Sequence, residues 1–284
     1  HAASAFFPSP FEDAAILTMD GVGEWDTATI GLGNGNQMKL LKALQFPHSL
    51  GLLYSAFTYF CGFKVNSGEY KLMGLAPYGK PVFKDLIFDY LIDLKDDGSF
   101  EVNLEYFNYC QGLTMTNDRF ARLLDGPSRQ SEDQITEREI NLAASIQAVT
   151  EDIVLKMATF AREQTGKKNL CLSGGVALNC VANGKLQSQK IFEKIWIQPA
   201  SGDAGGALGA ALFLNYQLLN RDREVNEQDS MFGSYLGPKF NDQDISSFIE
   251  EKNACSTFYE SEDELLTIVA QAIIDGKIIG WFQG

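Results

Sequence analysis

The sequence predicts an α/β fold that binds ligands at the carboxyl ends of its strands. The main observation is that residues 169–212 contain two strand-turn-helix units in succession. Apolar runs at 170–172 and 195–197 supply the strands, and each turn is built from residues without bulk. The turns read Ser173-Gly174-Gly175 and Ser201-Gly202-Asp203-Ala204-Gly205-Gly206. Because 284 residues exceed one typical domain, we expect two domains or subdomains.

The two glycine-rich turns have the composition of a ligand site. Glycine lets a ligand approach the main chain, and the helix expected at about 176–187 would point its free N–H groups at that ligand. Asn179, one turn into this helix, can both donate and accept hydrogen bonds. Asp203 follows the second strand, at the edge where open α/β sheets bind ligands. The alternative is that the glycines only allow tight helix-strand packing.

Composition excludes several classes of partner. A net charge of −14 and a pI near 4.6 argue against a nucleic-acid surface, which needs clustered Lys and Arg. Five cysteines without a C-x-x-C pair fit reduced thiols in the cytoplasm. No run approaches the roughly 20 apolar residues of a membrane span. We therefore expect a cytoplasmic protein with neither a nucleic acid nor a membrane as partner.

The first 61 residues predict three strands and a helix. Strands at 15–19 and 27–32 flank the turn 20–23, which reads Asp-Gly-Val-Gly. This turn can wrap a phosphate with its amides and leave the carboxylate of Asp20 for a metal, although it is also an ordinary hairpin turn. A third strand is expected at 38–44. Ser49 should then cap a buried helix over 50–61.

The rest of the chain predicts a loop, an insertion and a long helix. Residues 66–79 contain too many glycines for a helix, so we expect a functional loop in which Glu69 and Lys71 are site residues or a solvated charge pair. Before the long helix we expect a helix at 82–91, a hairpin turned at 96–98 and a helix at 118–124. The long helix should start with a capping box at 136–139, run to about Gln164 and close at Gly166. After residue 219 we expect a linker at 220–229, helices at 242–251 and 262–275, and a strand at 278–282.

Taken together, the motifs resemble those of the O-carbamoyltransferases that modify antibiotics and nodulation factors. The resemblance covers nearly the whole chain and is carried by motifs in order at 1–11, 19–24, 68–79, 172–179 and 202–205. More distantly, the chain is similar to the synthases of threonylcarbamoyladenosine in tRNA. The resemblance implies an actin- and Hsp70-like (ribonuclease H-like) nucleotide-binding fold for an ATP- and metal-binding domain at 1–222. It also implies the beginning of a second α/β domain at 231–284.

The resemblance implies a two-step reaction. Carbamoyl phosphate and ATP would give carbamoyl adenylate, and the carbamoyl group would then pass to the hydroxyl of a small-molecule acceptor. A divalent metal, iron with magnesium or manganese as alternatives, would be held by His1, Asp20 and Asp203. Lys71, expected to face the anionic substrate, and Glu69 are the candidate catalytic residues. The implied cofactor-binding residues are Gly21, Gly23, Ser173, Gly174, Gly175, Asn179 and Gly205.

Two other functions stay open at this point. A sugar or acetate kinase of the same fold would release ADP, and a non-catalytic regulator would bind ATP without turnover. A homodimer is also left open. In the family, a first metal histidine and a first phosphate loop would precede His1, and a basic motif would follow Gly284. We therefore expect the chain alone to fold but to be inactive.

Overall fold

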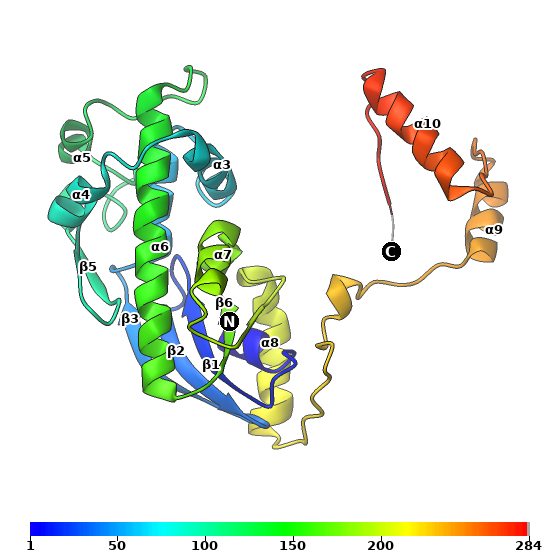
Figure 1. Ribbon diagram of the computed structural model, residues 1–284, viewed down its shortest axis with the longest axis horizontal. Coiled ribbons are helices and arrows are strands. Elements are labelled where there is room, and N and C mark those ends of the chain that lie inside the picture. Colours follow the sequence, from blue (N-terminus) through cyan, green and yellow to red (C-terminus); the bar gives the residue numbers. More distant parts are fainter. Residues whose placement is uncertain (283–284) are drawn as a thin grey trace. The chain divides into compact units, whose positions relative to one another are not determined.

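The computed structural model describes residues 1–282, which form two compact units divided after Ser230. The first unit is a mixed α/β structure, as predicted, with a five-stranded sheet at its centre (Figure 1). Its elements in chain order are α1 (Ala2–Phe6), β1 (Asp13–Met19), β2 (Asp26–Asn34), β3 (Gln37–Gln45), α2 (Leu50–Phe60), α3 (Glu69–Leu75), α4 (Lys84–Leu86), β4 (Ile92–Leu94), β5 (Phe100–Val102), α5 (Asp118–Leu123), α6 (Glu137–Thr165), β6 (Asn169–Ser173), α7 (Cys180–Ser188), β7 (Lys194–Ile197) and α8 (Gly206–Leu212).

The strand order in the sheet brings the predicted site together. The order is β3-β2-β1-β6-β7, with β1, β2 and β3 antiparallel in succession and with β6 and β7 parallel to β1. The register sets Leu17 against Leu172 and Thr18 against Ser173. Since parallel strands end at the same edge, the turns that follow β1, β6 and β7 all lie at that edge.

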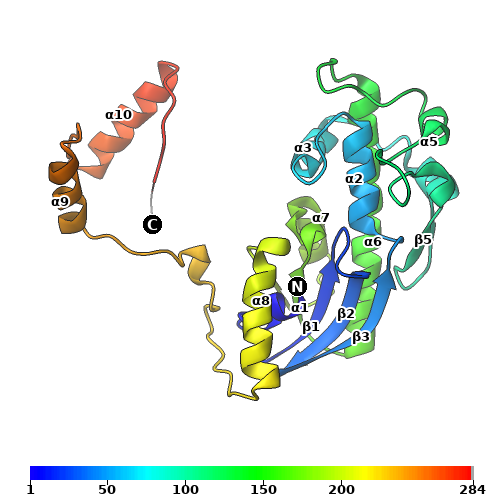
Figure 2. The ribbon, with the colours of Figure 1, turned by 180° about the vertical axis from the view of Figure 1, so that it is seen from behind.

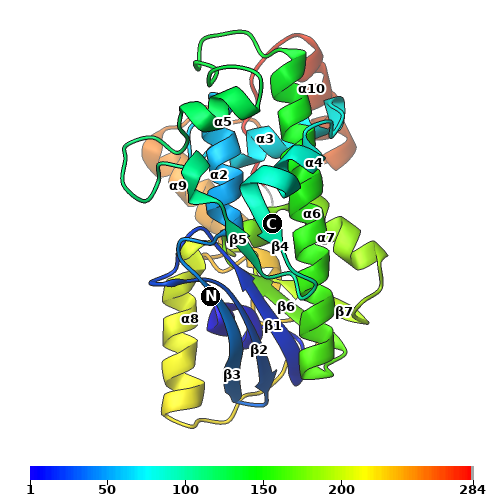
Figure 3. The same cartoon turned by 90° about the vertical axis from the view of Figure 1, so that its left-hand side faces the viewer.

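Side-chain alternation along β1 explains the two layers that cover the sheet. Leu17 and Met19 belong to the core on the α6 side, whereas Ala14 and Ile16 belong to a second core with Phe6 of α1. Helix α6 therefore covers one face, and α1 with α8 covers the other, as the views in Figures 2 and 3 show. Both faces of β1 are buried, which accounts for its continuous apolar run.

Helix α6 confirms the predicted start and end signals. At its first turn, the carboxylate of Glu139 accepts hydrogen bonds from the N–H of Thr136 at 2.9 Å and from its hydroxyl. At its end, Gly166 adopts the left-handed conformation at φ 63° and donates to the carbonyl of Arg162. A contact between Arg138 and Glu139 adds a charge-assisted bond at 2.9 Å. Local chemistry therefore fixes both ends of this 29-residue helix.

The Glu139 cap makes stability depend on pH. Burial raises the pKa of Glu139, but hydrogen bonds from Thr136 and Arg138 outweigh it and lower the pKa below its usual range. A lowered pKa contributes stability that is present above the unfolded value of about 4.3 and is lost as pH falls through the folded value. We expect Glu139→Gln to cost about 1 kcal/mol at pH 7. In urea denaturation, the deficit should shrink below about pH 4. The exposed Glu137→Gln is the control, and a deficit that stays constant with pH would contradict the cap.

Two predictions for the helices are wrong. Residues 69–75 form helix α3 rather than a loop, and the carboxylate of Glu69, the first residue of this helix, accepts from the N–H groups of Asn66 at 3.0 Å and Gly68 at 3.1 Å and so fixes the chain that leads into the helix. The helix predicted at about 176–187 begins instead at Cys180. A single 3-10 turn at Gly175–Leu178 precedes this helix, and Asn179 is the N-cap of the helix.

The predicted linker at 220–229 is anchored to the first unit by Arg223. Its guanidinium donates to the carbonyls of Phe6, Phe7, Ser9 and Gly35 at 2.9–3.1 Å. The group also lies 4.5 Å from the centroid of the Phe6 ring. Arg223 therefore binds this segment to carbonyls at the end of α1 and in the turn between β2 and β3, so the segment is not a free connection.

We expect Arg223→Ala to destabilise the first unit by roughly 2–4 kcal/mol, because four carbonyls lose a charged donor. The stability of Arg223→Lys should lie between those of the wild type and Arg223→Ala, since an ammonium group carries the charge but cannot reproduce the planar fork of the guanidinium. The midpoint of urea denaturation measures the effect. Arg221→Ala is the matched control, because this neighbouring side chain is exposed and has no side-chain hydrogen bond within residues 1–282. An unchanged midpoint for Arg223→Ala would contradict the anchor.

The second unit contains α9 (Asp242–Lys252) and α10 (Glu262–Ile274), which confirm the two predicted helices. The strand predicted at 278–282 is wrong, since these residues have no regular structure. A strand needs a neighbouring strand for its backbone hydrogen bonds, and none pairs with these residues in the described chain. In the first unit, the helix predicted at 82–91 is split into α4 and a π-helical turn at Ile87–Leu91.

Candidate functional site

Three predicted metal ligands meet at the carboxyl edge of the sheet. His1 precedes α1, Asp20 follows β1, and Asp203 follows β7. The Nε2 atom of His1 lies 2.7 Å from Oδ2 of Asp20 and 3.6 Å from Oδ1 of Asp203. One ligand atom from each residue lies within 4.8 Å of those of the other two. An imidazole and two carboxylates at this spacing form a donor set that suits a divalent cation.

Asp20 is the most constrained of the three residues. Its Oδ1 accepts from the N–H of Gly175 at 3.1 Å, so the first glycine turn contacts the carboxylate directly. Burial raises the pKa of Asp20, but hydrogen bonds from His1 and from the N–H groups of Gly175 and Gly21 lower it below its usual value. Asp20 is therefore an anion at neutral pH. Asp203 contrasts with it, because its side chain is 97% exposed.

The position of His1 is fixed through its backbone. Its carbonyl accepts from the hydroxyl of Ser173 at 2.8 Å, from the hydroxyl of Ser4 at 2.7 Å and from the N–H of Ala5 at 3.0 Å. The hydrogen bond to Asp20 raises the pKa of the His1 ring. Its Nδ1 is buried and has no hydrogen-bond partner within the described residues. Ser173, predicted to bind a cofactor, thus uses its hydroxyl to position His1.

The turn after β1 is held in place by the start of α2. Ser49, which also caps this helix as predicted, shares its hydroxyl between the carbonyls of Asp20 and Gly21. Gly51 packs so closely that a Cβ there would lie 2.5 Å from the carbonyl oxygen of Asp20. The Asp20 turn is therefore rigid at its base, and this role of Ser49 is one that the sequence analysis missed.

The predicted cofactor glycines divide into two groups. A Cβ at Gly174 would lie 2.2 Å from the carbonyl oxygen of Met19, and Gly174 also has φ +89°. Gly23 and Gly205 likewise have no space for a side chain, because an added Cβ would lie 2.8 and 2.2 Å, respectively, from a backbone oxygen. Gly174 and Gly205 fit the tight-packing alternative, and Gly23 fits the alternative of an ordinary hairpin turn. Gly21 instead opens onto free space, and a Cβ at Gly175 would meet only Oδ1 of Asp20, at 3.2 Å. Gly21 and Gly175 are thus the glycines that leave room for a ligand.

Asn179 is bound into a network that the sequence analysis did not predict. Its amide pairs with the amide of Gln147 from α6 through two hydrogen bonds, at 3.0 and 3.1 Å. Gln147 was hidden by its place on the apolar side of a long helix, where only its polarity distinguishes it from neighbours such as Ala143 and Ile146. In the structure, Gln147 stands out as a polar side chain in a buried position, since the residue is only 4% exposed and its amide must therefore find hydrogen-bond partners.

Glu69 and Lys71 lie on α3, apart from the three metal candidates. The carboxylate of Glu69 accepts hydrogen bonds from the hydroxyl of Ser55 at 2.8 Å and from the backbone N–H groups of Asn66 and Gly68. Lys71 is exposed, with its Nζ 6.0 Å from the centroid of the Tyr70 ring. No hydrogen bond or ion pair joins either residue to the three metal candidates in the part of the chain that the structure describes. Helix α3 does approach the start of α7, where Sδ of Met73 lies 4.0 Å from Sγ of Cys180.

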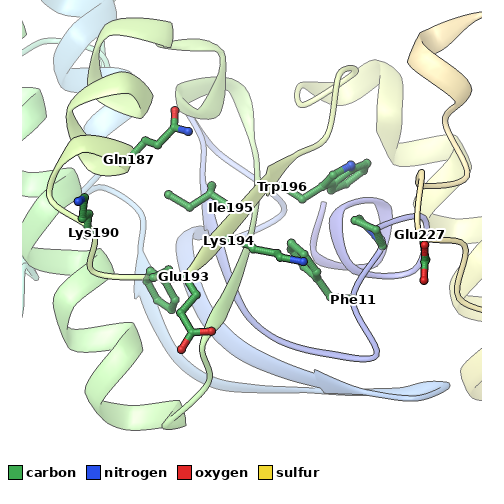
Figure 4. Close-up of a pocket in the computed structure, with 10 residues that line it drawn as sticks. Phe11, Gln187, Lys190, Glu193, Lys194, Ile195, Trp196 and Glu227 are labelled. Atoms are coloured by element: carbon green, nitrogen blue, oxygen red, sulfur yellow. The ribbon is translucent and has the colours of Figure 1, made fainter.

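A pocket of about 1170 Å³ lies along the edge strand β7 (Figure 4). Its lining consists of Pro10, Phe11, Gln187, Lys190, Phe192, Glu193, Lys194, Ile195, Trp196 and Glu227. None of these residues belongs to the predicted site. The pocket is therefore distinct in its lining from the cluster of His1, Asp20 and Asp203.

Residues 1–212 match the model of the family described as Carbamoyltransferase N-terminus. The chain belongs to this carbamoyltransferase family. Nodulation protein NolNO of Sinorhizobium fredii is 36% identical over the whole chain, and nodulation protein NolO of Bradyrhizobium diazoefficiens is 32% identical over the same span. An uncharacterized protein of Synechocystis is 56% identical, again over the whole chain. The predicted resemblance is confirmed, and membership of a carbamoyltransferase family supports carbamoyl transfer in general.

The chain spans only part of these relatives. It covers 46% of the Synechocystis protein, 39% of NolNO and 49% of NolO. Among residues 1–282, none of the helices has the length and apolar character that crossing a membrane requires.

Proposed function

We propose that the full-length protein is an ATP-dependent O-carbamoyltransferase that forms carbamoyl adenylate from carbamoyl phosphate and ATP, with release of phosphate and pyrophosphate. The carbamoyl group then passes to the hydroxyl of a small-molecule acceptor, and AMP leaves. The observation that carries the proposal is the convergence of Asp20, Asp203 and the open Gly175 turn at one sheet edge in a carbamoyltransferase. We propose an actin-like nucleotide fold for the first unit, supported by its mixed sheet with glycine turns at the strand ends.

The residues at this edge fit a divalent metal. His1 contributes one imidazole nitrogen, Asp20 and Asp203 contribute carboxylates, and a second ring nitrogen of His1 is buried without a partner. We propose that these three side chains hold iron, with magnesium or manganese as alternatives. When bound, the ion supplies positive charge that balances the phosphates during transfer.

The chain's own groups would bind and orient the nucleotide. The open positions Gly21 and Gly175 leave space for phosphate and nucleoside atoms next to the backbone, whereas Gly23, Gly174 and Gly205 set the shape of the turns. Asn179, at the N-cap of α7, adds a side-chain contact. Glu69 holds α3 in place, and we propose that Lys71 on the same helix meets the anionic carbamoyl donor.

One reaction separates this proposal from its alternatives. The full-length protein, incubated with ATP and carbamoyl phosphate, should release pyrophosphate only when both substrates are present. A kinase of the same fold would give ADP instead, and a regulator would bind ATP without any product. ADP formation, or binding without turnover in metal-loaded protein, would contradict the carbamoyltransferase proposal.

A further inference from the structure

Asn179 sits in a closed network of side chains from three helices. Its Nδ2 donates to Oε1 of Gln147 at 3.0 Å, and its Oδ1 accepts from Nε2 of Gln147 at 3.1 Å. The hydroxyl of Tyr54 donates to the same Oε1 at 3.0 Å, and Nε2 of Gln147 also donates to Glu151 at 3.1 Å. Tyr54, Gln147 and Asn179 are 7%, 4% and 8% exposed, so solvent competes little for these bonds.

Two groups at the ends of the network decide which way the amides face. The carboxylate of Glu151, bound on its other oxygen by Lys185 at 3.0 Å, can only accept, so it must face the nitrogen of Gln147. The N–H of Ala182 can only donate, so it must face the oxygen of Asn179, which it does at 3.0 Å. Both constraints agree with the paired amides, and the orientation of Asn179 is therefore fixed.

The network leaves Asn179 with a single unused hydrogen-bonding group. Its oxygen is occupied by Gln147 and Ala182, and one N–H is occupied by Gln147. The second N–H of Nδ2 has no acceptor among the described residues, in a side chain that is more than nine-tenths buried. Gln147 has no unused group, because both of its N–H bonds and both oxygen positions are taken. Asn179 can therefore offer a donor and no acceptor.

We propose that Gln147 is a positioning residue that locks Asn179 as a donor, so that the turn after β6 selects a hydrogen-bond acceptor on the nucleoside of ATP. This inference rests on the proposed function and adds to it a specificity rule. Without Gln147, the amide of Asn179 loses two of its three bonds and is held only by the N–H of Ala182. A single bond still favours the donor orientation but opposes rotation of the amide less than three bonds do. A ligand acceptor then meets a donor only part of the time.

The test compares ATP with analogues that each lack one acceptor: the 1-deaza, 3-deaza, 7-deaza, 2′-deoxy and 3′-deoxy forms. Calorimetry on the full-length protein gives each dissociation constant. In the wild type, we expect one analogue to bind at least 10-fold more weakly than ATP. In Asn179→Ser, which keeps an N-cap hydroxyl, the ratio for that analogue should fall to about 1. In Gln147→Met, where the N–H of Ala182 still holds the oxygen of Asn179, the ratio should fall clearly below its wild-type value. Urea denaturation of each variant records any loss of stability separately.

The ratio distinguishes positioning from a merely structural role. If Gln147 only supported the fold, Gln147→Met would weaken ATP and every analogue equally, and the ratios would stay at their wild-type values. Unchanged ratios, or a wild type that binds all five analogues as well as ATP, would overturn the inference while the proposed function stands. Absence of ATP binding to the wild type would instead contradict the proposed function itself.

Discussion

Asp20→Asn in the full-length protein is expected to lose its divalent metal and to form pyrophosphate at least about 10³-fold more slowly. The reason is that Asp20 is the ionised centre of the site, in contact with His1 at 2.7 Å and with the N–H of Gly175 at 3.1 Å. An amide keeps the shape and can retain hydrogen bonds, but it lacks the charge that attracts the cation. Elemental analysis of the purified protein and a pyrophosphate assay measure the two effects.

Asp13→Asn provides the matched control, because Asp13 begins the strand that Asp20 follows. Its carboxylate pairs with Lys167 at 2.6 Å at the opposite edge of the sheet, far along β1 from the site. We expect metal content and rate to remain at the wild-type level in this variant. Full metal occupancy in Asp20→Asn would mean that Asp20 is structural, and it would remove the metal from our proposal.

Gly175→Val is expected to fold normally and to weaken ATP binding by 100-fold or more, on the order of 3 kcal/mol. The new Cβ would meet only Oδ1 of Asp20, at 3.2 Å, a tight contact that a shift of this carboxylate by a few tenths of an ångström relieves. The branched side chain would then fill the open space in which we propose that the nucleotide lies. Calorimetry with ATP and the denaturation midpoint test the two parts. Gly184→Val in α7 is the control, since a Cβ there meets nothing within 4 Å.

The neighbouring residue should behave in the opposite way. Gly174→Ala would place a Cβ 2.2 Å from the carbonyl oxygen of Met19 at a backbone angle of φ +89°. We expect this variant to be strongly destabilised even though alanine is small. If Gly175→Val bound ATP with unchanged affinity while remaining folded, the open turn would not be the nucleotide site.

The parts of the fold that the sequence predicted are those that depend on local chemistry. The apolar runs of β1 and β6, the Ser49 cap and the signals at Glu139 and Gly166 each act within a few residues. Helix α3 was missed because its glycine-rich composition argued against a helix, whereas the carboxylate of Glu69 binds the N–H groups of Asn66 and Gly68 and fixes the chain that leads into the helix. A propensity summed over a window does not contain such side-chain contacts.

The parts that could not be predicted depend on partners distant in the chain. His1, Asp20 and Asp203 were named together through the family resemblance. Asp20 and Asp203 are close because β1 and β7 end at the same edge of the sheet, and His1 joins them because Ser173 binds its carbonyl. Gln147 and Asn179 are 32 residues apart and meet only because α6 packs beside α7. Arg223 binds carbonyls more than 180 residues earlier. From the sequence alone, each such contact is visible at most as a polar residue whose partner cannot be identified.

Anomalous diffraction from crystals of the full-length protein, grown with an unreactive ATP analogue and a divalent iron or manganese salt, tests the central claim most directly. We predict one metal peak within about 2.0–2.4 Å of ligand atoms from His1, Asp20 and Asp203, with the nucleotide beside Gly175. The contradicting result is a nucleotide or a metal bound elsewhere, such as in the pocket along β7, with these three side chains free of any ion.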